Sequence, residues 1–171
     1  MRRKTAHLPH NRLKRPSQVL ALHRHRIREI ALHYDWGYNV VGPLKGALPD
    51  DHPMVLGMTG FWGTKFINGK CRDADWILAL GTRFSEADCS SWEEEYTFRM
   101  PPTQLIHIDI DPAEIGRNFP VAIGAVADLK GALRVLNRVA RKLAPNGVQR
   151  PELLAEMEAN RKSFVAANKA A

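Results

Sequence analysis

Four histidines near the start of the chain have the type and spacing that could bind a metal ion. They are His7, His10, His23 and His25. Histidine-containing metal sites in proteins commonly add a thiolate or a carboxylate, and residues 1–28 contain no cysteine, aspartate or glutamate. The favoured interpretation is therefore a solvated basic segment and not a metal site.

Two cysteines, Cys71 and Cys89, could in principle pair, bind a metal or act as nucleophiles. They lie 18 positions apart without a second pair, so neither a disulfide framework nor a four-thiolate site is indicated. The tripeptide Cys89-Ser90-Ser91 has no histidine close to it in sequence that would suggest an activated nucleophile. We interpret both cysteines as ordinary thiols.

The elements that would position a site follow from the apolar pattern after Tyr38. Short apolar runs alternate there with helical segments, which is typical of a parallel α/β sheet. The runs predict strands at residues 39–42, 76–80, 105–108 and 122–126. Ligands of open parallel sheets bind at the carboxyl ends of the strands, so the loops after these strands are the expected place of any site.

Helices are expected between the strands and at both ends of the chain. Asp128 is placed to cap a helix with an apolar stripe at Leu129, Leu133, Leu136, Val139 and Leu143. Other helices are predicted from Ser17 to Gly37, between Gly63 and Gly69, and from Pro151 onward. The predicted fold is α/β, with a single Rossmann-like parallel sheet and flanking helices.

The positive charge is concentrated at the start of the chain. The net charge is +7, and residues 1–28 hold nine Lys and Arg residues and no acidic residue, while the remainder is close to neutral. Such a segment could bind nucleic acid through phosphate contacts, weakly and without reading bases. Because no compact basic face is indicated, nucleic-acid binding is a disfavoured alternative.

No apolar run approaches the roughly 20 residues that cross a bilayer, and the basic start lacks the apolar region of a secretory signal. A cytoplasmic protein without membrane contact is expected.

Four segments occur together in one order and carry a family resemblance. They read HPMVLGMTGFWG, DADWILALGTRF, LIHIDIDPAEIGRN and GAVADLKGALRVL. Over about residues 29–143 the chain resembles the central domain of thiamine-diphosphate enzymes of the acetolactate synthase group. The resemblance implies a domain lodged between two thiamine-binding domains, with thiamine diphosphate and Mg²⁺ as cofactors of the parent enzymes.

The charge pattern and the resemblance together predict a division of the chain, and the resemblance implies a set of contacts. Residues 1–28 would be a disordered basic arm, residues 29–145 the central domain, and residues 146–171 a linker helix toward a C-terminal domain. In acetolactate synthases this domain cradles FAD. The corresponding flavin or nucleotide contacts here would be Gly57, Met58, Thr59, Gly60, Gly81, Arg83, Asp109, Asp111 and Asp128.

Each of these contacts has a structural alternative, which the sequence leaves open. Gly57 and Gly60 could serve a turn, and an arginine at a strand end such as Arg83 often forms a surface ion pair. Asp109 and Asp111 could cap the short helix beginning at Pro112, and for Asp111 we favour this role.

Departures from the family pattern argue against a working enzyme. The family's first strand and Gly-rich loop correspond to residues 17–25, which contain no glycine, so this strand is expected to be missing or altered. Residues 85–88 lack the usual aspartates and arginine after the Arg-Phe pair, which makes FAD possible but disfavoured, and no Gly-Asp-Gly segment for magnesium occurs.

The leading hypothesis from the sequence is a truncated or fragmentary enzyme of this family that retains a structural domain. A non-catalytic nucleotide-binding or regulatory module is the alternative. The expected partners are a second copy of the chain or the missing thiamine-binding domains.

Overall fold

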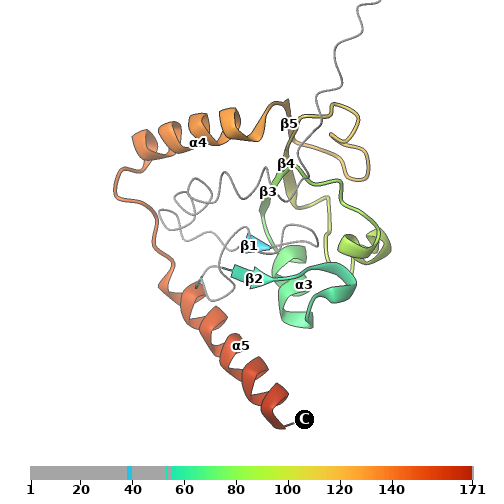
Figure 1. Cartoon of the computed structure of the whole chain (residues 1–171), viewed down its shortest axis with the longest axis vertical. Coiled ribbons are helices and arrows are strands. Elements are labelled where there is room, and N and C mark those ends of the chain that lie inside the picture. Colours follow the sequence, from blue (N-terminus) through green and yellow to red (C-terminus); the bar gives the residue numbers. More distant parts are fainter. Residues whose placement is uncertain (1–37, 40–52, 54, 171) are drawn as a thin grey trace, which may run out of the picture.

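The computed structural model describes residues 38–39, 53 and 55–170, and it shows an α/β arrangement of parallel strands with flanking helices (Figure 1). The strands are β1 (Tyr38–Asn39), β2 (Val55–Gly57), β3 (Trp76–Leu80), β4 (Gln104–Asp109) and β5 (Ile123–Val126). The helices are α3 (Lys65–Arg72), α4 (Leu129–Leu143) and α5 (Pro151–Ala170), with short 3-10 turns η2 (Gly60–Trp62) and η3 (Ala87–Trp92). The predicted fold class is confirmed.

Hydrogen bonding divides the described strands into two parallel sheets. One has the order β3-β4-β5, with Trp76 beside Gln104 and Ile106 beside Ile123. The other pairs β1 with β2, and Tyr38 lies beside Val55. Figure 1 shows α4 along the top of the strands, α3 next to β2, and α5 extending away from them.

The strands agree with the apolar pattern where the runs are long. The prediction of residues 76–80 matches β3, the run at residues 105–108 lies inside β4, and β5 begins at Ile123. No strand is predicted from the sequence between residues 42 and 76, where β2 forms at Val55–Gly57. Of the strand predicted at residues 39–42, only Asn39 lies within the described residues, and it is in β1.

Asp128 caps α4 as predicted, because its Oδ2 accepts a hydrogen bond of 3.0 Å from the backbone N–H of Gly131. Leu133 is buried, with Leu80, Leu136 and Ala140 packed against it. The outer end of the predicted stripe behaves differently, since Leu143 is exposed.

The other two predicted helices after residue 60 also form. α5 begins at Pro151 as predicted and buries Met157, while α3 begins at Lys65 and continues past Gly69 to Arg72. Neither these helices nor the other described ones combine the length and apolar character needed to cross a membrane.

The main core is an aromatic cluster under the loops of the three-stranded sheet. Phe84, Phe98 and Phe119 contact one another edge to face, with ring centroids 5.3 to 6.0 Å apart. Leu105 of β4 and Cys89 of η3 also belong to this cluster. The core therefore fixes the segments that follow β3 against the sheet.

Several predictions concern residues outside the described part of the chain. The basic arm at residues 1–28, the helix from Ser17 to Gly37 and the segment at residues 17–25 that corresponds to the family's first strand all lie there. The domain boundaries therefore stay predictions.

Candidate functional site at the carboxyl ends of the strands

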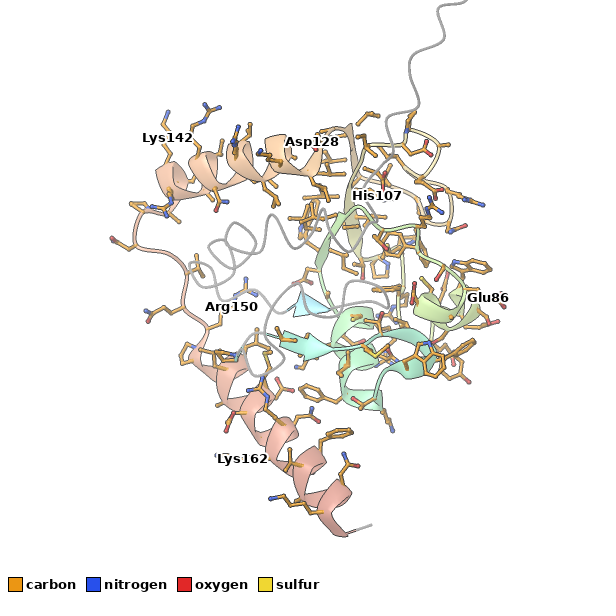
Figure 2. The ribbon with its side chains drawn as sticks, in the orientation of Figure 1. Glu86, His107, Asp128, Lys142, Arg150 and Lys162 are labelled. Atoms are coloured by element: carbon orange, nitrogen blue, oxygen red, sulfur yellow. The ribbon has the colours of Figure 1, made fainter. Side chains whose placement is uncertain are left out.

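The structure brings three of the predicted site residues to one edge of the three-stranded sheet. The backbone N–H of Gly81 donates to the carbonyl of Ile108 at 2.8 Å, and the N–H of Ala127 donates to the carbonyl of Asp109 at 2.9 Å. These bonds hold Gly81, Asp109 and Asp128 next to one another, where the strands end. Figure 2 shows Asp128 at the start of α4, next to the strands and away from Glu86 on the η3 loop.

The aspartates at this edge each use one carboxylate oxygen in a local turn. Asp109 Oδ1 accepts from the N–H of Asp111 at 2.9 Å, and Asp111 Oδ1 accepts from the N–H of Ala113 at 2.9 Å. Together with the cap at Asp128, these bonds supply a structural reason for each carboxylate. Each side chain has a second oxygen that could still accept a hydrogen bond from a hydroxyl group.

Arg83 lies in an ion pair at the surface. Its Nε is 3.7 Å from Oε1 of Glu114, and its side chain is 77% exposed, whereas that of Glu114 is 8% exposed. The buried carboxylate has a closer partner in Arg117, whose Nη1 lies 3.0 Å away. The geometry therefore favours a surface ion pair for Arg83. Glu114 would still pair with Arg117 if Arg83 were absent.

Residues 57–60 form a second and separate group. Thr59 is buried, and its hydroxyl donates to the carbonyl of Asp88 at 3.1 Å. Gly60 has φ +68°, and a Cβ there would lie 2.0 Å from the carbonyl oxygen of Ala87. The side-chain amide of Asn68 binds both the N–H and the carbonyl of Gly60, at 3.0 and 2.9 Å.

These contacts explain why glycine occupies position 60. The η2 turn packs directly on the backbone of η3, so the missing side chain admits a segment of the same chain and leaves no open cradle for a diphosphate. Gly57 has φ +120° at the end of β2, where a Cβ would meet Ile67 at 3.1 Å, and Met58 beside it is half-buried. The structure thus offers a turn and packing role for both glycines.

Thiamine diphosphate needs magnesium and an acidic set of ligands, and the described residues do not fit that requirement. No group of three or more His, Cys, Asp or Glu side chains in residues 55–170 could hold a metal ion. No catalytic step through this cofactor is derived for the chain.

Beside the packed junction of η2 and η3 lies an open groove of about 580 Å³. Gly60 and Phe61 line one side, and Ser90, Ser91, Glu93 and Tyr96 line the other. Apart from Gly60, none of these residues is identified from the sequence. Exposed aromatic residues could have marked this surface, but the sequence alone does not show which aromatics are exposed.

One wall of this groove contains a strained backbone. Ser90, Ser91 and Trp92 have φ values of 52°, 57° and 60°, which are in the left-handed region that side chains disfavour. Two hydrogen bonds hold this turn, from Trp92 Nε1 to the carbonyl of Phe84 at 2.9 Å and between the hydroxyls of Ser90 and Thr97 at 2.8 Å. The tertiary contacts thus maintain a conformation that the local sequence opposes.

Cys89 is buried next to this turn, and its environment disfavours the thiolate. Burial, reinforced by the negative charge of Asp88, raises the pKa of the Cys89 thiol to about 12. Cys71 is buried as well, and no disulfide joins the two residues. The expectation that they do not form a disulfide framework agrees with the structure, and their interpretation as ordinary thiols stays a prediction.

His107 is a buried polar residue of β4 that the sequence analysis did not single out. Its Nε2 lies 2.9 Å from the carbonyl oxygen of Thr82, and its ring contacts Phe84 edge to face at 5.5 Å. Nδ1 has no hydrogen-bond partner in the part of the chain that the structure describes. Because a carbonyl can only accept, Nε2 carries the proton and ties the loop after β3 to β4.

Comparison with known proteins identifies this arrangement of parallel strands and loops. Residues 20–136 match the family described as thiamine pyrophosphate enzyme, central domain, and the chain belongs to that family. The match includes all the described strands and the first half of α4. The resemblance found from the sequence motifs is confirmed, and thiamine diphosphate is the cofactor of the parent enzymes.

The relatives that the chain matches include acetolactate synthases. The probable acetolactate synthase large subunit of Methanocaldococcus jannaschii is 44% identical over 92 residues, covering 54% of this chain and 15% of the relative. Acetolactate synthase of Mycobacterium leprae is 32% identical over 131 residues, covering 75% of this chain and 20% of the relative. The acetolactate synthase large subunit of Cyanidium caldarium is 32% identical over 118 residues, covering 69% of this chain and 20% of the relative. The chain therefore matches a fifth or less of the length of these relatives.

Proposed function

We propose that this chain is a structural central domain of an acetolactate-synthase-type enzyme, and that catalysis requires thiamine-binding domains that these residues do not supply. The observation that carries this proposal is the match of residues 20–136 to the central domain alone. It is supported by the relatives, because the chain matches at most 20% of the length of those compared here.

The chemistry of the described residues supports the same proposal. The loops at the sheet edge contain Asp109 and Asp128, each engaged by a backbone N–H, and the nearby arginines pair with Glu114. This arrangement stabilises loops and presents surfaces to a partner. It does not assemble the general base and metal ligands that thiamine-dependent chemistry requires.

Pyruvate turnover tests the proposal directly. The purified chain, supplied with thiamine diphosphate, Mg²⁺ and pyruvate, is expected to release no carbon dioxide above a protein-free control. An intact acetolactate synthase assayed in parallel verifies the conditions. Turnover that scales with the concentration of this chain would refute the structural role.

A nucleotide-binding module is a second candidate, favoured by the convergence of Gly81, Asp109 and Asp128 at one sheet edge. A ligand that binds only the native state raises the melting temperature. Thermal melts with FAD, NAD or thiamine diphosphate plus Mg²⁺ would show such a shift for one of them. Unchanged melting at saturating concentrations of all three would eliminate this candidate.

A cytoplasmic location, and association with a second copy or with separate thiamine-binding domains, complete the proposal. Size-exclusion chromatography of the full chain checks the first form of association, because a strictly monomeric elution would exclude stable self-association.

A further inference from the structure

Three large aromatic side chains are exposed around the groove beside η2 and η3. Phe61, Trp62 and Tyr96 are 61%, 68% and 63% exposed. Phe61 and Tyr96 line the groove from opposite elements, and Trp62 adjoins Phe61. A concentration of exposed aromatic surface beside a groove is typical of an interaction site.

The same surface is strongly acidic. Residues 84–98 contain five acidic residues and no Lys or Arg, and Glu93, which lines the groove, is followed in sequence by Glu94 and Glu95. These three carboxylates are exposed, and none forms an ion pair within the described residues. Figure 2 shows Glu86 of the same segment at the outer edge of the molecule, far from α5.

Acidic residues elsewhere in the fold are more often paired. Glu156 lies 2.6 Å from Lys70, Glu158 pairs with two residues of its own helix, and Glu114 pairs with Arg117. Residues 86–95, next to the exposed aromatics, hold five carboxylates without an ion pair among the described residues.

This combination selects a particular ligand chemistry. A guanidinium group stacks on an aromatic face and at the same time donates hydrogen bonds to a carboxylate. Arginine therefore uses both features of the groove, whereas an anionic ligand would be repelled by residues 93–95. The groove consequently fits an extended, arginine-rich peptide.

We propose that the groove binds the arginine-rich N-terminal segment of the same chain, residues 2–15. This segment contains Arg2, Arg3, Lys4, Arg12, Lys14 and Arg15 and no acidic residue. It precedes the family match, which begins at residue 20, so its composition is not required by the domain itself.

Chain connectivity allows this contact. Asn39 of β1 lies beside Gly57 of β2, only three residues before Gly60 at the groove. The residues between Arg15 and Tyr38 could span up to roughly 75 Å if extended, at about 3.3 Å per residue. Because the two partners share one chain, their effective concentration reaches the order of millimolar and supports weak individual contacts.

Proteolysis of the full chain tests the proposal. The groove variant E93Q/E94Q/E95Q removes three charges without adding cleavage sites, and E152Q/E156Q/E158Q on α5 is the control with the same charge change. Trypsin cleavage after Arg12 and Lys14 is followed by mass spectrometry at about 20 mM and about 500 mM salt, conditions under which exposed charges are weakly and strongly screened.

At low salt, wild type and the α5 control are expected to be cleaved at least about fivefold more slowly than the groove variant, since pairing restricts access of the protease. At high salt the three proteins should be cleaved at similar rates. Circular dichroism and melting curves that match wild type establish that the groove variant is folded.

Three results would overturn the proposal. The first is equal cleavage of wild type and groove variant at low salt. The second is protection that grows with protein concentration, because it would assign the groove to the segment of a second copy. The third is protection that requires added RNA, because it would make the segment a nucleic-acid binder.

Discussion

The hydroxyl of Thr59 donates a hydrogen bond of 3.1 Å to the backbone carbonyl of Asp88, across 29 residues of sequence. Thr59 follows β2 in the two-stranded sheet, and Asp88 belongs to the segment after β3 in the three-stranded sheet. This bond therefore joins the loops of two sheets that share no strand. The close packing of Gly60 on Ala87 reinforces the same junction.

The substitution Gly60→Ala is expected to break this junction. The new Cβ would meet backbone atoms at 2.0 to 2.7 Å and would occupy a left-handed conformation. We expect the free energy of unfolding, measured by urea denaturation, to fall by about 2–5 kcal/mol. Gly69→Ala is the control, because its nearest neighbour is 3.9 Å away within α3, and it should raise stability by about 0.5–1 kcal/mol. Equal effects of the two substitutions would contradict the packing described for Gly60.

Ser91→Gly should relieve backbone strain in the wall of the groove. Ser91 has φ 57°, and its side chain makes only one long hydrogen bond, of 3.4 Å, to Glu86. Glycine adopts this conformation without a steric cost, so stability to urea should increase by up to about 1 kcal/mol. Ser163→Gly, in the helical conformation of α5, should instead lower it by about 0.5 kcal/mol. A loss of stability in Ser91→Gly would show that the turn is not strained.

Asp128→Ala removes the cap of α4. The lost hydrogen bond to Gly131 should lower the free energy of unfolding by about 1 kcal/mol, again measured in urea. Asp128→Asn keeps a side-chain oxygen that can accept this bond, so it should remain within a few tenths of a kcal/mol of wild type. If Asp128→Asn lowers the free energy of unfolding as much as Asp128→Ala, the negative charge and not the capping hydrogen bond stabilises α4.

Cys89 should remain protonated and unreactive in the folded protein at neutral pH. Its pKa is raised from an ordinary value of 9.0 to about 12, so the stability that depends on the neutral thiol is complete below pH 9 and is lost as the pH rises from 9 toward 12. A thiol-disulfide reagent at pH 8 should label Cys89 only after denaturant is added. Rapid labelling of Cys89 in the native protein would contradict its burial.

Local signals in the sequence identify the regular elements well. The five apolar residues of β3 are bounded by Asp75 and Gly81, and this pattern predicts the strand with its observed ends. Asp128 is recognised as a cap because capping depends on residues within one helical turn. β2 is missed because three residues that end in glycine carry no measurable periodicity.

The geometry of the candidate site is harder to predict from the sequence, because it depends on contacts between segments that are distant along the chain. The role of Gly60 depends on Ala87, and the left-handed turn at Ser90 is held by Thr97 and by the ring of its neighbour Trp92. The short helix expected at Pro112 is wrong, because residues 112–116 form a turn, although Asp111 does accept a hydrogen bond from the N–H of Ala113 at its start. Whether the predicted contacts bind a nucleotide stays a prediction.

The order β3-β4-β5 has a consequence for how the chain folds. Trp76 pairs with Gln104 and Ile106 with Ile123, so all the partners in this sheet come from residues 76–126. The β3–β4 register contains five residue pairs and the β4–β5 register four, whereas β1 and β2 share only two. The three-stranded sheet should therefore retain slow amide hydrogen exchange after the shorter β1–β2 pair has opened.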